Sequence, residues 1–244
     1  MAISYKDVNT TVEGLPYPIF SRTYMATSLT IDNSLSYSPY NQFGKRGIWR
    51  ADGPVGGSLS LSAFVLGEYD FTSFITNKNK TVPYAVGGTS GYLASLNIQG
   101  DPTTPVSLDL QFESVSGFTL TTTAPATGNF SPALGVLSRV SGLSVGSSNY
   151  SFSYSLTKNY GRLLYRGGRE TFYLQGGEER VTVESDTTAT LASPCPNTTG
   201  VMLELRGCTG DAGKISVSGN IVDYSSAVSE GDIVRNTLTV VNTF

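Results

Sequence analysis

The sequence of 244 residues contains no histidine, a single tryptophan and two cysteines. The missing imidazole excludes Ser-His-Asp catalysis, Cys-His catalysis and His-ligated zinc sites. Only 14% of the residues are charged, and the formal net charge is −3. This charge argues against a nucleic-acid binder, because such proteins need a dense cationic surface to neutralise phosphates. No apolar run approaches the ~18 residues of a membrane span, so no membrane partner is expected.

Cofactor motifs are also missing. The glycine-rich segments GPVGG, GGTSG and RGGRE match neither the phosphate-binding loop nor the dinucleotide fingerprint, so we predict turns and no cofactor. The N-terminus has no signal-peptide pattern, which predicts a protein that stays in the cytosol after synthesis. Cys195 and Cys208 are then interpreted as inert structural thiols, with a late disulfide in a released particle as the alternative.

Carboxylates remain as possible catalysts, because a glycosidase needs only two of them. The candidates are Asp109 with Glu113, and Glu178 or Glu179 with Glu184. Surface solubility explains these residues better, since carboxylates are rarely buried and their spacing reveals no pairing. We therefore predict that the protein is not an enzyme.

Alternating apolar and polar residues indicate an all-β protein. SLSLSAF, RVTVESD and KISVSGNIV each place apolar side chains at every second position, the period of a half-buried strand. YSFSYS at 150–155 combines an aromatic face with a hydroxyl face. Such strands close into sandwiches or barrels, or pair across chains at their edges.

The chain also resembles itself. A shift of 117 positions, from 19 to 136, aligns similar residues without a gap. The matched positions are Arg22 with Arg139, Tyr37 with Tyr154, Phe43 with Tyr160, Gly44 with Gly161, and Lys45 with Arg162. Further on the shift drifts, so that Leu96–Gly100 resembles Ile215–Gly219 and Val106–Leu110 resembles Val234–Leu238. We predict two tandem, structurally similar β-sandwich or barrel domains at 1–120 and 133–244, joined by a Pro/Thr/Gly-rich linker at 121–132.

The matched residues receive structural interpretations. Gly44 and Gly161 each follow an aromatic residue and precede a cation, which predicts turns that need the conformational freedom of glycine. The four matched cations are too isolated for a phosphate site, and we expect them beside strand ends or over aromatic rings. Trp49 has Tyr165 as its counterpart, which favours a structural role over a sugar-stacking one.

Several segments of the sequence resemble structural proteins of bacteriophage tails. The similar features are the strand ending in Phe43-Gly44-Lys45, the alternating strand after it, and the closing segment with the turn Ser229-Glu230-Gly231-Asp232. The resemblance implies a tail-tube-like β-sandwich whose strands join those of neighbours around a DNA channel. It also implies arms that reach the next ring, for which 77–105 and 185–213 are the candidates.

The resemblance further implies a virion tail protein that assembles in the host bacterial cytoplasm, with itself and other tail proteins as partners. DNA would pass through without specific binding, and no small-molecule ligand is expected. Two tube domains per chain predict rings of three chains with pseudo-sixfold symmetry, stacked into a tube. The alternatives are a carbohydrate- or receptor-binding virion module and a carboxylate glycosidase.

Overall fold

The fold is known from a computed structural model of the chain, which describes residues 10–14, 23–24, 26–42, 45–65, 71–86, 89–118, 136–141, 149–165, 169–185, 198–207, 210–228 and 235–244. The helix α1 is the short segment Thr72–Thr76. The strands are β1 (Thr10–Gly14), β2 (Thr23–Tyr24), β3 (Ala26–Gln42), β4 (Lys45–Phe64), β5 (Pro83–Val86), β6 (Thr89–Gly100), β7 (Ser107–Ser114), β8 (Val136–Ser141), β9 (Asn149–Tyr165), β10 (Arg169–Ser185), β11 (Thr198–Gly207), β12 (Gly210–Ala227) and β13 (Arg235–Thr243).

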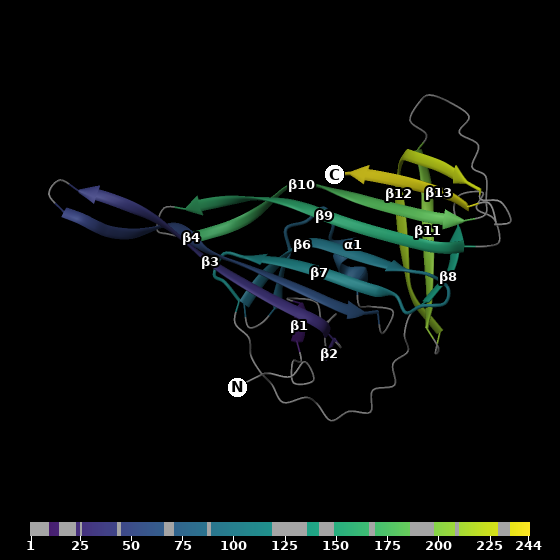
Figure 1. Ribbon diagram of the computed structural model, residues 1–244, viewed down its shortest axis with the longest axis horizontal. Coiled ribbons are helices and arrows are strands. Elements are labelled where there is room, and N and C mark those ends of the chain that lie inside the picture. Colours follow the sequence, from purple (N-terminus) through teal and green to yellow (C-terminus); the bar gives the residue numbers. More distant parts are fainter. Residues whose placement is uncertain are drawn as a thin grey trace.

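All thirteen strands belong to one antiparallel sheet. The longest path through it is β2-β1-β5-β6-β9-β10-β13-β12-β11-β8, while β7 joins β6 to β4, and β3 follows β4. In Figure 1 the long strands β9 and β10 run along the longest axis of the molecule, and β11 and β12 cross them steeply. The predicted all-β class is confirmed.

The same strand order occurs twice. In the first half the neighbours run β1-β5-β6-β7-β4-β3. In the second half they run β8-β11-β12-β13-β10-β9. Apart from β2, which pairs with β1, each described strand of one half thus has a counterpart at the same place in the other half. This agreement of topology supports the internal duplication that was predicted from the sequence.

The agreement extends to individual residue pairs in the hairpins β6–β7 and β12–β13. The pairs Tyr92–Glu113, Leu93–Phe112 and Ser95–Gln111 return 128 positions later as Asn220–Val241, Ile221–Val240 and Asp223–Thr239. Both ladders therefore skip one residue at the same place, Ala94 in one and Val222 in the other. Two chance hairpins would not share a β-bulge at one position, because a bulge depends on local sequence. The predicted match of Val106–Leu110 with Val234–Leu238 has this same shift.

The long hairpins β3–β4 and β9–β10 correspond with a different shift. Leu29 opposite Leu61 corresponds to Phe152 opposite Val183, because Leu61 and Val183 lie opposite the equivalent residues Leu110 and Leu238. Position 29 thus corresponds to 152, a shift of 123 positions. By this register Tyr37 corresponds to Tyr160, six residues beyond its predicted counterpart Tyr154. Period-2 alternation explains the discrepancy, because any even shift keeps every side chain on its face.

The match of Leu96–Gly100 with Ile215–Gly219 is displaced in the same way. In the ladders Leu96 lies opposite Leu110 and Tyr224 lies opposite Leu238. Leu96 therefore corresponds to Tyr224. Sequence similarity predicted a duplication, but it did not predict the register of each strand.

One hydrophobic core serves both halves. The alternating residues predicted to face inward are buried: Leu59, Leu61, Ala63, Leu108, Leu110, Phe112, Phe152, Tyr154, Val181, Val183, Ile215 and Val217. They form a single cluster with residues of α1 and the neighbouring loops. Because the halves share one sheet and one core, the division into two tandem domains stays a prediction, and residues 121–132 lie outside the described residues.

The segments expected to be projecting arms contribute strands to the sheet where the structure describes them. Residues 83–86 and 89–100 are β5 and β6, and residues 198–207 are β11. What projects is the far end of the β3–β4 hairpin, which extends beyond the tip of β9 and β10 (Figure 1). β4 pairs with β7 only from Gly57 to Phe64, so the rest of this hairpin is a two-stranded arm.

Candidate functional site

The two halves meet at a seam between β6 and β9. Six residue pairs form it, from Ser95 opposite Thr157 to Gly100 opposite Phe152. On the same edge of β6, the earlier residues pair with β5, which begins at Pro83 opposite Tyr92. β5 and β9 therefore pair with successive parts of the same edge of β6. The sheet passes from one half to the other through main-chain hydrogen bonds.

A polar cluster, here called the clamp, fastens this seam from the core side. The Lys158 Nζ donates to the carbonyl oxygens of Asn77 at 2.8 Å and Lys80 at 2.9 Å. The fully buried Glu179 accepts from the Tyr154 hydroxyl at 2.9 Å and forms an ion pair with Lys78. Burial lowers the pKa of the Lys158 ammonium to about 8. Since each charge has partners from the other half, the clamp holds residues 77–80 of the first half on β9 and β10.

Two open edges of the sheet have counterparts that are closed within the chain. Among the described strands, β3 pairs with β4 alone, whereas its counterpart β9 pairs with both β10 and β6. β11 accompanies β12 only up to Asn220. Beyond that residue, β13 is the partner of β12 among the strands that the structure describes. These are the two edges that would meet if the seam were repeated between copies.

Exposure differs at equivalent positions of the closed and the open edges. Ala94 is 9% exposed, but its counterpart Val222 is 55% exposed. Ile98 is fully buried in the seam, whereas its counterpart Ser226 is exposed. Open sheet edges are sites for pairing with another chain, and both Val222 and Val228 are exposed in the stretch that follows the last pair of β12 with β11.

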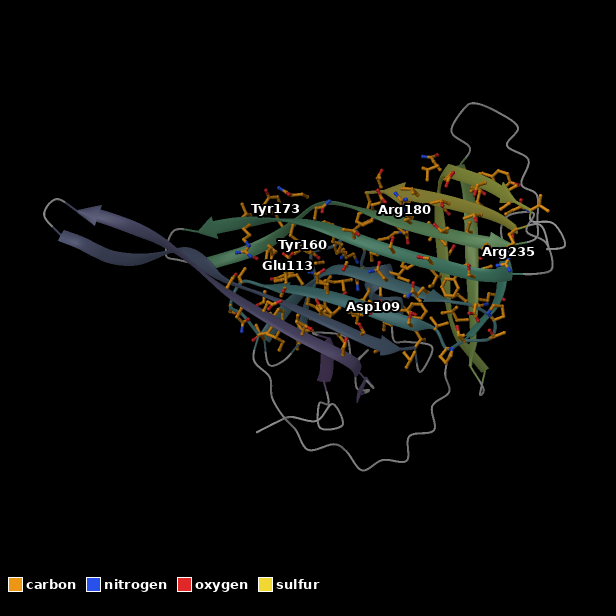
Figure 2. The ribbon with its side chains drawn as sticks, in the orientation of Figure 1. Asp109, Glu113, Tyr160, Tyr173, Arg180 and Arg235 are labelled. Atoms are coloured by element: carbon orange, nitrogen blue, oxygen red, sulfur yellow. The ribbon has the colours of Figure 1, made fainter. Side chains whose placement is uncertain are left out.

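The sheet face opposite the core is polar and is called the polar face below. It carries hydroxyl and amide side chains from β4, β7, β6, β9, β10 and β13 in adjacent rows. The acidic residues on it are Asp32, Asp109, Glu113, Glu178, Glu184, Glu204 and Asp223, and the basic ones are Arg180, Lys214 and Arg235. Each arginine lies beside a glutamate, at 3.1 Å and 3.5 Å. Figure 2 labels both arginines together with Asp109 and Glu113. The described part of this face is therefore acidic.

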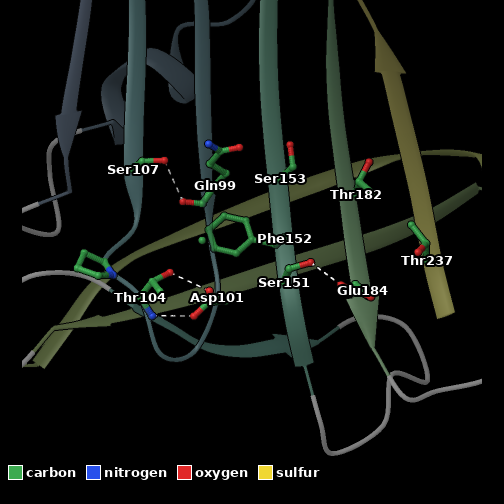
Figure 3. A pocket seen from close by; sticks show the side chains of 12 residues that line it. Gln99, Asp101, Thr104, Ser107, Ser151, Phe152, Ser153, Thr182, Glu184 and Thr237 are labelled. Atoms are coloured by element: carbon green, nitrogen blue, oxygen red, sulfur yellow. Dashed lines mark hydrogen bonds between the residues drawn. The ribbon is translucent and has the colours of Figure 1, made fainter. Parts of the chain in front are cut away.

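A hollow of about 590 Å³ crosses the seam on the polar face (Figure 3). Its carboxylates are already engaged by neighbouring groups. Asp101 accepts from the backbone and side chain of both Thr103 and Thr104, and these bonds lower its pKa to about 2. Glu184 accepts from the Ser151 hydroxyl at 2.9 Å. The hollow is thus a hydroxyl-lined depression that offers no uncommitted acid and base pair.

The carboxylates considered as glycosidase candidates do not form a pair. Asp109 and Glu113 lie four residues apart on one strand, about 13 Å by strand geometry, which is too far for either glycosidase mechanism. Glu179 is buried on the core side, away from the face that carries Glu178 and Glu184. No cluster of potential metal ligands occurs among the residues described. In the same residues, no helix has the length and apolarity needed to cross a membrane.

Some of the matched residues have informative surroundings. Arg162 lies over the Phe172 ring, 5.3 Å from its centroid, which confirms the expected cation over an aromatic ring. The Tyr160 hydroxyl donates to the Leu93 carbonyl at 2.9 Å, so this residue links β9 to the first half. Gly161 does not form a turn, and that prediction is wrong. It lies inside β9 opposite Tyr173, whose ring would be 2.3 Å from an added Cβ.

The other matched residues are described less fully. Tyr37 lies in β3, Lys45 begins β4, and Arg139 lies in β8 opposite Glu204. Arg22, Phe43, Gly44, Cys195 and Cys208 lie outside the described residues, so the predictions about them stay predictions.

Sequence reasoning missed the clamp. Lys158 falls in phase with Phe152, Tyr154 and Leu156, the buried side of β9. A lysine in the apolar phase of a strand was therefore a visible signal of a buried charge. Its partners come from residues 77–80, about eighty positions away, and no local pattern points to them. Comparison with family models and with curated proteins found no match for this chain.

Proposed function

We propose that this protein is a structural protein of a bacteriophage tail, which self-assembles into rings or a tube that forms a channel for DNA passage. The observation that carries the proposal is the duplicated sheet with an acidic polar face and two open edges that match its own internal seam. A protein of this design gains its function by adding copies of itself and needs no catalytic group.

The polar face suits the wall of a DNA channel. Its hydroxyl and amide groups can be wetted, and its acidic residues repel phosphates that pass by. Proteins that hold DNA do the opposite, because they present lysine and arginine to many phosphates at once. DNA is accordingly proposed to pass without specific binding. The apolar face is covered by the core within the chain, so only the polar face remains for the channel.

The dimensions are compatible with a ring of three chains. Along the continuous path β3-β4-β7-β6-β9-β10-β13-β12, each chain supplies eight strands. Strands lie about 4.8 Å apart, so three chains would give a circumference of about 115 Å and a backbone diameter of about 37 Å, larger if the strands tilt. This diameter leaves room for a duplex after the side chains of the wall are counted. Rings would stack in the virion tail, beside other tail proteins, after assembly in the host cytoplasm.

Electron microscopy of the concentrated, purified protein tests the proposal. We expect rings or tubes with a central channel. A protein that stays monomeric at the highest attainable concentration and binds immobilised glycans would contradict the proposal and support the carbohydrate-binding alternative.

A further inference from the structure

We infer that a second copy of the chain pairs its β3 with β12 of the first copy, antiparallel and in a register set by the internal seam. This inference rests on the proposed self-assembly and adds the surface and the residues through which it occurs. The occupant of the open β12 edge is thereby a defined segment, residues 28–34 of another copy.

The argument begins with the edge of β6. β5 begins at Pro83 opposite Tyr92, and β9 takes over the same edge three residues later at Ser95. In the second half β11 begins at Thr198 opposite Asn220, the counterpart of Tyr92. Three residues later on β12 lies Asp223, the counterpart of Ser95. Among the described strands, the edge is therefore open at the position where the seam begins in the first half.

The register follows from the two shifts already measured. A residue of β6 corresponds to the residue of β12 that lies 128 positions later in the sequence. A residue of β9 corresponds to the residue of β3 that lies 123 positions earlier. Applied to the seam, these shifts place Asp223 opposite Ser34, Ser225 opposite Asp32, Ser226 opposite Ile31, and Ala227 opposite Thr30. In the pairs of Asp223 with Ser34 and of Ser225 with Asp32, all four residues are on the polar face. Ser226 and Ile31 are on the core side.

The side chains of the two edges are compatible in this register. Asp223 lies opposite a serine and Asp32 lies opposite another serine, so no two acids stand directly opposed, an arrangement that would be unfavourable. Side chains at Thr30, Asp32, Ser34, Ser225 and Ala227 are exposed and available for such contact. The pairing would also cover Val222, as β9 covers its counterpart Ala94.

The geometry makes the association directional. The seam uses β6 of the first half and β9 of the second, whereas the contact between copies uses β12 of the second half and β3 of the first. The resulting contact is head-to-tail, and such contacts close into a ring when the rotation per unit divides a full turn. Closure removes both open edges, which is how a sheet of this kind avoids uncontrolled aggregation.

Disulfide trapping in the full chain tests the register. In a background with Cys195→Ser and Cys208→Ser, we expect oxidation of the variant Asp32→Cys with Ser225→Cys to shift the protein from monomer to disulfide-linked dimers and larger species. The matched control is Ser28→Cys with Ser225→Cys. Position 28 is about 13 Å further along β3, beyond the reach of about 7 Å between the Cα atoms of a disulfide, so this variant should stay monomeric.

A second control uses the seam itself. Asn97 and Ser155 are directly opposed within the chain and are the counterparts of Ser225 and Asp32, so Asn97→Cys with Ser155→Cys should close within one chain. The inference is overturned if this internal pair closes while the Asp32–Ser225 variant stays monomeric, or if the Ser28 control links equally well.

Hydrogen exchange of the unsubstituted protein provides a test without cysteines. Assembly should slow amide exchange by about tenfold or more in peptides covering 28–34 and 221–228, and unchanged exchange in assembled protein overturns the inference. Electron micrographs of the trapped samples separate the two proposals. If rings form but the disulfide does not, the proposed strand pairing is contradicted and the proposed tail function still stands. If the chains become linked but form neither rings nor tubes, the strand pairing is supported and the tail function is contradicted.

Discussion

The β9–β10 and β3–β4 hairpins occupy equivalent places in the sheet, but they differ in how their first strands, β9 and β3, are paired. β9 is paired on both sides, and its base is fastened by the clamp. β3 is paired on one side among the described strands. The residues that correspond to Tyr154 and Glu179 are Ile31 and Gly57, which cannot form an equivalent clamp. The comparison indicates that the seam within the chain is permanent, whereas the proposed seam between copies relies on main-chain pairing and apolar contact alone.

The largest expected effect comes from the clamp. Glu179→Ala should lower the free energy of unfolding by about 3 kcal/mol or more, because it leaves Lys78 and the Tyr154 hydroxyl without their buried partner. The neighbouring variant Glu178→Ala is the matched control. It removes an exposed ion pair with Arg180 and should change stability by less than about 1 kcal/mol. Denaturant titration measures the free energy of unfolding of both variants. Equal losses would contradict the claim that the core-side glutamate stabilises the fold more than the exposed one.

The equivalent glycines Gly91 and Gly219 compare the two halves more closely. A Cβ at Gly219 would lie 2.2 Å from the Val241 backbone oxygen, whereas one at Gly91 would lie 3.1 Å from the Phe118 ring. Backbone yields less easily than a ring, so Gly219→Ala should cost about 2 kcal/mol and Gly91→Ala less. Gly200→Ala, whose nearest neighbour is 3.6 Å away, serves as the control. Thermal unfolding measures the order, and a larger loss at Gly91 would contradict it.

The buried lysine gives the seam a pH dependence. Burial lowers the pKa of Lys158 to about 8 from its ordinary value of 10.5. Between these values the unfolded chain holds a proton that the folded chain has released, so stability should rise with pH. The rise from pH 8 to 9 should be about 1 kcal/mol, and Lys158→Met should flatten it. A slope that the substitution leaves unchanged would assign the effect to another group.

The smallest effect concerns the turn that follows the seam strand β6. Hydrogen bonds from Thr103 and Thr104 hold the pKa of Asp101 at about 2, below its ordinary value of 3.8. This contribution to stability is present above pH 4 and is lost as the pH falls toward 2. Asp101→Asn should therefore reduce the acid sensitivity of unfolding in that window. An unchanged acid profile would contradict this assignment.

The sequence predicted the fold class and the buried faces. Alternation at period 2 is sufficient for these, because it reports which side of a strand is apolar. It did not predict the register of the long hairpins. Gly161 shows why: its place in a strand opposite Tyr173 depends on pairing that sequence similarity does not encode. The seam and the clamp were also beyond prediction, since their partners come from separate halves of the chain.

The number of chains per ring tests the central claim most directly. If both halves are equivalent units and copies join β12 to β3, each chain fills two positions of a pseudo-sixfold ring. Native mass spectrometry or electron microscopy of the assembled particles should then give three chains per ring, with the contact inside a chain and the contact between chains superposing. Six chains per ring, or a particle in which β3 and the end of β12 both face solvent, would contradict the account.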